Sequence, residues 1–410
     1  MPVNGVFGSE SWGADQRPTN FREAILYLMP NGKAPITALM ARTAKESVND
    51  PQFSWWDEPQ NLLRLVKKGR VEAGENRILV DGDDPREDNL GTPWGSALHL
   101  TLGDLLMVEP KTDSETFAPE IMQVTGVLNK GEFTAARGKS GTTAAPIDPD
   151  QGLLKIGTAY PEGAPSPNAV SRNPIKYTNY TQIFKTAYEI SGTARQTHAR
   201  TGDELMNIRK RRMFDHSRDL EFATLFGTKS ESVGFNGLPV RTTAGIRSFI
   251  PAQNTTVFDD PVTTDSFLEA VYKVFDFESP AGDTRTAFCG NEALIEMNKV
   301  IRDSPNSRMD LGKEISVYGM NFREFVLPQG RLMLKTHPLL NRHPLYQKSM
   351  WILDFSSLKY RFLKGRDTHH RENIQNRDED SFKGMWLTEC GLEVQRGGLT
   401  MGYLGNISAS

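Results

Sequence analysis

The fold of this chain is decided by the stretch Asn179-Tyr-Thr-Gln-Ile-Phe-Lys-Thr-Ala-Tyr-Glu-Ile-Ser-Gly-Thr-Ala-Arg-Gln-Thr197 and by the charged segment that follows it. Residues 183–191 predict a β-strand. After a short break at 201–202, residues 203–226 predict one long helix, because the segment opens on two acidic residues, which suit the helix dipole, and Gly227 is a natural stop. Neither part carries a catalytic arrangement, so the stretch is interpreted as a strand followed by a long helix with a structural role.

The predicted helix carries a narrow apolar stripe, since Met206, Met213 and Leu220 recur every seven residues. The basic run 209–212 could be a nucleic-acid patch, but consecutive helical positions point around the helix instead of lining one face. Acidic residues follow within two turns, which favours salt bridges within or between subunits. The charged residues that fill the remaining faces are Arg209, Lys210, Arg211, Arg212, Asp215, Arg218, Asp219 and Glu221.

The composition argues against a protein whose main role is to bind nucleic acid. The 410 residues hold 48 Lys and Arg against 51 Asp and Glu, a net charge of -3, whereas phosphate binding calls for a basic excess. Only 38% of the residues are hydrophobic, which predicts thin cores or extended arms that neighbours help to bury.

No apolar run approaches the ~20 residues that span a bilayer. The first residues lack the basic and apolar regions of a signal peptide, so we expect folding in the cytoplasm.

The N-terminal third predicts extended structure. Residues 1–60 have the character of an arm and not of an independent domain. Phe53, Trp55 and Trp56 lie between prolines, and aromatic residues in such an extended segment usually anchor against another surface. Residues 61–90 begin with an apolar and basic run. Gly, Asp and Glu predominate after it, which predicts a long exposed hairpin or loop.

Residues 91–165 predict a small β-barrel or sandwich, because short strand-like runs alternate with turn signals. The predicted strands are 98–102, 105–109, 120–128 and 132–137, and residues 144–167 are a Pro/Gly-rich return.

Residues 256–365 predict an α/β unit, with amphipathic helices at 265–277 and 291–301 and a strand at 284–289 between them. A charged excursion over 366–380 follows this unit. Further strands are predicted at 314–318, 322–327, 332–336, 350–355, 358–363, 385–388 and 392–395.

Motifs of catalysis and metal binding are incomplete. The run Arg137–Thr143 contains Gly-Lys-Ser, but a phosphate loop needs glycine where Phe133 stands, so a turn is predicted. None of the seven histidines falls in a His-Glu-x-x-His arrangement, and adjacent His369 and His370 would point to opposite faces of a strand. The two cysteines form neither a disulfide framework nor a metal site. No cofactor is predicted.

The order of several short motifs resembles the major capsid proteins of tailed bacteriophages with the Hong Kong 97-type fold, in particular the SU-ten-like group. The stretches Phe53-Ser-Trp-Trp-Asp57 and Asn179-Tyr-Thr-Gln-Ile-Phe184 are similar to the family's entry into its extended loop and to the signature before its spine helix. Gly290-Asn-Glu-Ala-Leu294 resembles a strand-to-helix step of its axial domain. Leu358-Lys-Tyr-Arg-Phe-Leu363 and Leu392-Glu-Val394 resemble its C-terminal strands.

The resemblance implies an α+β capsid fold with an N-terminal arm, an extended loop, a peripheral domain with a long spine helix and an axial α/β domain, plus an inserted small β-barrel-like domain. The implied segments are 1–60 (N-terminal arm), 61–90 (extended loop), 91–165 (inserted β-rich domain), 166–255 (peripheral domain with spine helix 203–226), 256–365 (axial domain) and 366–410 (C-terminal peripheral strands and tail).

The implied protein is not an enzyme. It assembles in the host cytoplasm as hexamers and pentamers into the icosahedral shell of the virion, around packaged double-stranded DNA that it does not bind sequence-specifically. A separate scaffolding protein, a portal and a cement or decoration protein on the inserted domain are the implied partners, and no membrane is involved.

Charged and aromatic residues of the arm, loop, helix and excursion are hypothesised to form subunit interfaces. They are Phe53, Trp55, Trp56, Lys67, Lys68, Arg209, Arg211, Arg212, Asp215, Arg218, Arg366, His369, His370, Arg371 and Glu372.

Two other classes of protein stay open at this stage. One is a β-rich hydrolase or lyase with a scattered acidic site at Asp354, Asp367 and Glu389. The other is a different virion component, such as a portal or tail protein.

Overall fold

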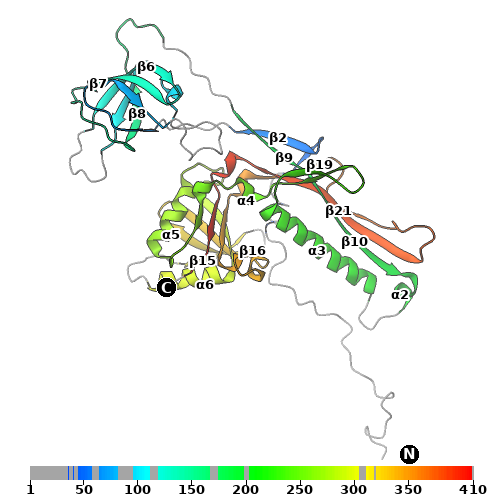
Figure 1. The fold of residues 1–410 in the computed structure, drawn as a ribbon. Coiled ribbons are helices and arrows are strands. Elements are labelled where there is room, and N and C mark those ends of the chain that lie inside the picture. Colours follow the sequence, from blue (N-terminus) through cyan, green and yellow to red (C-terminus); the bar gives the residue numbers. More distant parts are fainter. Residues whose placement is uncertain are drawn as a thin grey trace, which may run out of the picture.

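The computed structural model describes residues 36, 40, 45–57, 64–81, 96–110, 119–166, 174–197, 203–303, 311–317 and 320–408 (Figure 1). Most of the predicted N-terminal arm therefore lies outside the described residues. The division of the chain into six segments stays a prediction.

A five-stranded sheet carries the long helix. Its order is β1-β19-β21-β10, with β20 paired to β21. The helix α3 (Glu204–Phe226) runs along the two longest strands of this sheet, as Figure 1 shows, and confirms the predicted helix at 203–226. The strands are β1 (Lys45–Val48), β10 (Gln182–Ser191), β19 (Leu358–Leu363), β20 (His369–Arg371) and β21 (Ser381–Val394).

Local chemistry fixes both ends of α3. Asp203 caps the N-terminus, its Oδ1 accepting from the Met206 backbone N–H at 3.2 Å. At the other end, a Cβ on Gly227 would lie 2.5 Å from the carbonyl oxygens of Ala223 and Thr243, so only glycine fits. The predicted apolar stripe is only partly correct, because Leu220 is buried while Met206 and Met213 are about half exposed.

A seven-stranded mixed sheet forms the second unit, in the order β13-β22-β18-β14-β17-β16-β15. The strands are β13 (Thr255–Val257), β14 (Thr284–Cys289), β15 (Leu311–Val317), β16 (Met320–Leu327), β17 (Gly330–Thr336), β18 (Met350–Leu353) and β22 (Gly402–Gly405). The helices α5 (Thr264–Val271) and α6 (Asn291–Asp303) confirm the two predicted helices, although α5 gives way to the 3-10 helix η5 (Tyr272–Phe275).

The two faces of this sheet are buried in different cores. Ala287 and Cys289 of β14 pack with α5 and α6, while Phe288 between them packs with the end of α3. Alternate residues of β18 divide in the same way, as strand geometry requires. The second core therefore joins the seven-stranded unit to α3 and the five-stranded sheet.

A third sheet stands away from the rest of the described chain at the end of a two-stranded ribbon (Figure 1). The ribbon pairs β2 (Gln52–Asp57) with β9 (Ile175–Tyr180), and the six-stranded sheet between them in sequence has the order β3-β8-β5-β6-β7-β4. Its strands are β3 (Arg64–Val66), β4 (Arg77–Leu79), β5 (Asp104–Val108), β6 (Ile121–Asn129), β7 (Glu132–Lys139) and β8 (Gly152–Thr158).

This sheet differs from the sequence-based expectation in three places. Strands β3 and β4, in the expected loop 61–90, pair with β8 and β7. The predicted strand at 98–102 is wrong, because a Ser96 cap starts the 3-10 helix η3 (Ala97–His99) there. Strand β8 forms in the Pro/Gly-rich return, since Leu153 is needed to complete a separate core around Phe133.

The remaining elements are short. A hairpin of β11 (Ser230–Val233) and β12 (Pro239–Thr242) follows α3. The others are α2 (Gly192–Gln196), α4 (Ile246–Phe249), η4 (Ala252–Asn254), η6 (Leu340–Arg342), η7 (Tyr346–Lys348), η8 (Phe355–Ser357) and η9 (Arg396–Gly398). Within the part of the chain that the structure describes, no helix has the length and apolarity to cross a membrane.

The separate core of the six-stranded sheet makes a first prediction. A fragment of residues 61–165 should fold alone, because it keeps the whole cluster around Phe133, Leu106 and Leu153. We expect a single cooperative thermal transition by circular dichroism. A Phe133→Ala fragment should be less stable by about 3–5 kcal/mol, and a wild-type fragment without any transition would contradict autonomous folding.

Candidate assembly interface

The ribbon β2–β9 is fastened to the body by aromatic side chains on one of its faces. Phe53 and Trp55 are buried, and the Trp55 ring centroid lies 5.9 Å from that of Tyr177 and 5.8 Å from that of Phe249 in α4. Trp56 faces the other way and is 59% exposed, with the Lys176 ammonium 5.7 Å from its ring centroid. Phe53 and Trp55 therefore anchor the ribbon to the body of their own subunit, whereas the side chain of Trp56 is exposed at the surface.

The two lysines of the interface hypothesis have opposite surroundings. Lys67 is buried, and its Nζ donates to the carbonyl oxygens of Lys68 at 2.6 Å and Gly69 at 3.0 Å. Burial lowers the pKa of Lys67 to about 8. Lys68 is exposed. Lys67 is therefore used in the turn after β3, and Lys68 is the accessible member of the pair.

Charged residues of α3 pair along the helix. Arg211 bonds Glu204 at 2.9 Å, and Asp215 accepts from Arg212 and from Arg218, each at 3.3 Å. Salt bridges were expected within or between subunits, and these three pairs are within the subunit. Because the arginines are exposed or half-exposed, each pair stabilises the helix by only a few tenths of a kcal/mol, ~0.3–0.5.

A denser cluster joins α3, β10 and β20. The Tyr188 hydroxyl lies 2.7 Å from Nε2 of His370, and Nε of Arg209 donates to the same hydroxyl at 3.4 Å. Glu372 pairs with Arg209 and with Nδ1 of His370, the latter at 3.1 Å. Burial and then the Arg209 charge lower the pKa of His370, against the opposing effect of Glu372. The cluster holds the short strand β20 against the spine.

The neighbouring histidine points elsewhere, as expected for adjacent strand residues. Nδ1 of His369 lies 2.7 Å from the Asp367 carbonyl oxygen, and Arg371 donates from Nε to Nε2 of His369 at 3.1 Å. Arg366 pairs with Glu389, which also accepts from the Thr181 hydroxyl at 3.2 Å.

The carboxylates of the hydrolase alternative each have a local structural use. Asp354 caps η8, accepting from the Ser356 backbone N–H at 3.0 Å and the Ser357 hydroxyl at 2.6 Å. Burial would raise the pKa of Asp354, but hydrogen bonds from the Ser356 and Ser357 hydroxyls outweigh this effect and hold the pKa below its ordinary value. Asp367 accepts from the Tyr360 hydroxyl at 3.0 Å. The lowered pKa of the capping Asp354 carboxyl group suits a structural role better than proton transfer.

One buried carboxylate that sequence reasoning missed joins three parts of the chain. Oε1 of Glu221 in α3 accepts from the Ile36 backbone N–H at 2.9 Å and lies 2.8 Å from Nε2 of His337, which follows β17. Glu221 and His337 are fully buried. The available signal was spacing, because Glu221 precedes buried Leu225 by one helical turn and so shares its face.

Asn179 explains why the decisive stretch opens as it does. Its amide nitrogen donates to the carbonyl oxygens of Ala244 at 3.1 Å and Leu392 at 2.7 Å, and its Oδ1 accepts from the Ala244 N–H at 2.8 Å. The side chain is fully buried. It therefore links the end of the ribbon to the segment just before α4 and to strand β21.

A spine helix along a five-stranded sheet, an α/β unit joined to that helix and a sheet carried on the two-stranded ribbon make up the described part of the chain. The model of the SU10 major capsid protein family matches residues 6–406, and the chain belongs to this family.

One relative and two solved structures are similar to this chain. The major capsid protein of Pseudomonas phage PaMx41 is 25% identical over 406 residues, covering 97% of this chain and 91% of that protein. A structure from Mycobacterium phage Bobi aligns with 8% identity over 96% of both chains and a TM-score of 0.47. The capsid of Myoviridae phage XM1 aligns with 8% identity over 95% of this chain and 97% of that chain, with a TM-score of 0.44.

The chain is thus a major capsid protein of a tailed phage, a structural component of the virion shell. The interface role of the fifteen residues named from sequence stays a prediction.

Removing the buried carboxylate should destabilise the subunit strongly. Glu221→Ala leaves the Ile36 N–H and His337 without their shared acceptor, and each stranded buried group costs about 1–3 kcal/mol. We expect urea unfolding of unassembled subunits to show a loss of about 3 kcal/mol. The control Asp219→Ala removes an exposed carboxylate of the same helix and should cost less than about 1 kcal/mol. Equal losses for both would refute the role of Glu221.

A buried histidine should make stability depend on pH. His216 lies 3.0 Å from the Thr186 hydroxyl and 2.8 Å from the Thr388 hydroxyl, and burial lowers its pKa below the ordinary 6.5. The unfolded chain therefore takes up the proton first, so stability is present above about pH 6.5 and is lost as pH falls through the folded-state pKa. Between about pH 7.5 and 5.5 the free energy of unfolding should fall less in His216→Gln than in wild type. Parallel curves would contradict this.

Proposed function

We propose that the chain forms hexamers and pentamers that close into an icosahedral shell around double-stranded DNA, and that it acts without catalysis. The observation that carries the proposal is the six-stranded sheet held on the ribbon β2–β9, away from the subunit's own body (Figure 1). A module so tethered gains burial from neighbours more than from its own subunit. Many modest contacts of this kind, repeated by symmetry, can stabilise a closed shell.

The surface of the six-stranded sheet supports a decoration role for this module. Leu98, Leu102 and Leu128 are each more than half exposed there. A partner protein that covers such side chains removes apolar area from water, which favours its binding. We assign this module the binding of a cement or decoration protein.

Charge supports the proposed relation to DNA. A net charge of -3 gives no general attraction to phosphate, and Arg211, Arg212 and Arg218 of α3 are paired with acids of the same helix. Without strong adhesion, DNA can be packed and ejected freely. We further propose assembly in the host cytoplasm on a separate scaffolding protein, with a portal at one vertex.

Electron microscopy tests this proposal directly. The chain, expressed with and without the other structural proteins of its phage, should yield capsomer rings or closed shells, with pentamers at fivefold positions in averaged images. A chain that stays monomeric under both conditions would overturn the proposal. Matched expression of the Glu221→Ala variant shows whether a destabilised subunit alone can account for a loss of particles.

A further inference from the structure

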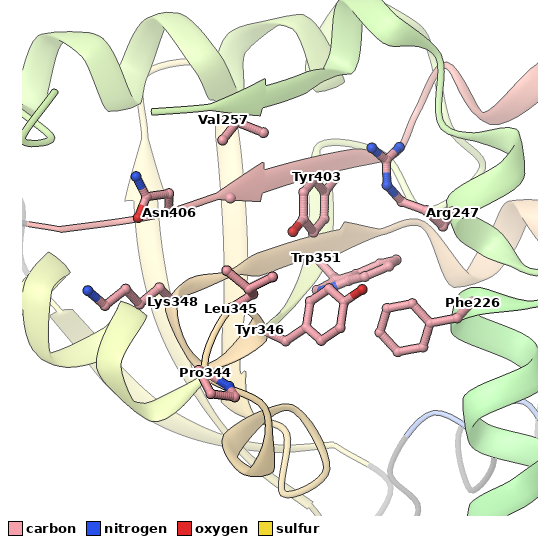
Figure 2. A pocket seen from close by; sticks show the side chains of 11 residues that line it. Phe226, Arg247, Val257, Pro344, Leu345, Tyr346, Lys348, Trp351, Tyr403 and Asn406 are labelled. Carbon is pink, nitrogen blue, oxygen red and sulfur yellow. The ribbon is translucent and has the colours of Figure 1, made fainter. Parts of the chain in front are cut away.

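A pocket of about 650 Å³ lies where the end of α3 meets the seven-stranded sheet. Its walls include four aromatic rings, and Arg247 and Lys348 lie at its margin (Figure 2). The rings pack on one another, with centroids 4.7 Å apart for Phe226 and Tyr346 and 4.9 Å apart for Trp351 and Tyr403. Such walls suit an aromatic guest, because its ring can add further tilted and edge-on contacts to those that the four rings already make.

One wall of the pocket carries an unsatisfied donor. The Trp351 side chain is fully buried, and within the described residues its Nε1–H has no hydrogen-bond acceptor. Figure 2 shows the indole beside Tyr403 and Tyr346, with its nitrogen at the end nearer Leu345. Because the nitrogen itself is buried, a guest reaches it only when the 70% exposed side chain of Leu345 moves aside. A buried N–H without a partner favours a guest that brings a carbonyl oxygen.

The same chain offers a matching guest. Phe235 at the tip of the β11–β12 hairpin is 106% exposed, and Val233 and Leu238 beside it are 78% and 62% exposed. The tip is ordered, since the Gly234 N–H donates to the Leu238 carbonyl at 2.8 Å and the Gly237 N–H donates to the Gly234 carbonyl at 3.0 Å. Gly237 takes the φ of +76° that closes the turn. An ordered tip loses little entropy on binding.

We propose that, in the shell, the tip of the β11–β12 hairpin of one subunit inserts Phe235 into the aromatic pocket of a neighbouring copy. There, Trp351 Nε1–H donates to a carbonyl oxygen of the tip, and Arg247 and Lys348 face the electronegative turn. The proposal rests on the assembly of this chain into a shell.

Three observations favour a second copy as the occupant. The full exposure of Phe235 shows that the tip does not fill its own subunit's pocket. The chain belongs to a family of major capsid proteins, and in the proposed shell every tip would meet copies of the same chain. A knob and a socket at different places on one surface also give a head-to-tail contact, which closes rings of identical subunits.

The first test removes the knob or blocks the socket. Phe235→Ser and Leu345→Asp should each lower the yield of sedimenting shells about tenfold, as expected for loss of one central apolar contact. Both side chains are exposed in the subunit, so unassembled variants should keep the wild-type melting temperature. Ile295→Ser, a change at a 53% exposed residue on α6, should leave the yield within about twofold. Wild-type yields for Phe235→Ser and Leu345→Asp would overturn the proposal.

The second test locates the contact. Chains with Phe235→Cys and chains with Leu345→Cys are co-assembled with wild type in excess and treated with a short bismaleimide. Cys289 and Cys390 are buried and should not react. We expect covalent dimers only when both variants are present, and none when Ile295→Cys replaces Phe235→Cys. Shells that give no dimer above this control would overturn the proposal, even if Phe235→Ser reduces assembly, because the tip would then dock elsewhere. Shell formation is scored separately by microscopy.

Discussion

A single buried carboxylate fixes how the parts of this subunit meet. Glu221 lies on the spine helix, and its Oε1 is shared by the Ile36 N–H and by His337 at the end of β17. A fully buried acid is tolerated only when its oxygens are bonded, so the position of α3 relative to both partners is tightly constrained. The surrounding core, with Leu225, Phe288 and Trp351, packs around this point. The spine helix is thus positioned by a polar contact and stabilised by the apolar one.

The hydrophobic residues of this polar chain are distributed over several separate cores, and this distribution determines the rest of the architecture. With 38% hydrophobic residues, the chain builds one core on each face of the seven-stranded sheet and a third inside the ribbon-borne sheet. Within the described residues, the five-stranded sheet shares the second core through one end of β19 and β21, at the buried Leu358, Leu392 and Val394, and elsewhere packs on α3 through small clusters around Phe184 and Tyr188. Hydrogen bonds and ion pairs, such as those of His216 and His370, supplement apolar burial there. This region depends most on polar geometry and therefore on pH.

Elements with strong local signals were predictable from sequence. The helix at α3, the strand β14 and the helix α6 have clear caps, stops or periodicity, and the structure confirms them. Elements that exist because of distant partners were not predictable in this way. Strand β8 forms in a Pro/Gly-rich segment through pairing with β3 and β5, and β20 forms in a charged excursion through pairing with β21. Glu221 was one of many charges on its helix. Its spacing from Leu225 could place it on the buried face, but its partners Ile36 and His337 could be identified only from the tertiary structure.

The distribution of partners also indicates what can drive recognition between copies. Sequence drew attention to charges, but Arg209, Arg211 and Arg366 already pair with acids of their own subunit. If one of these arginines pairs with an acid of a neighbouring subunit instead, it loses its present contact, so the net gain in binding free energy is small. Trp56 and Phe235 stay largely exposed, and covering them removes apolar area from water. Apolar knobs can therefore supply the free energy of contact between subunits, while the paired charges restrict which orientations are allowed.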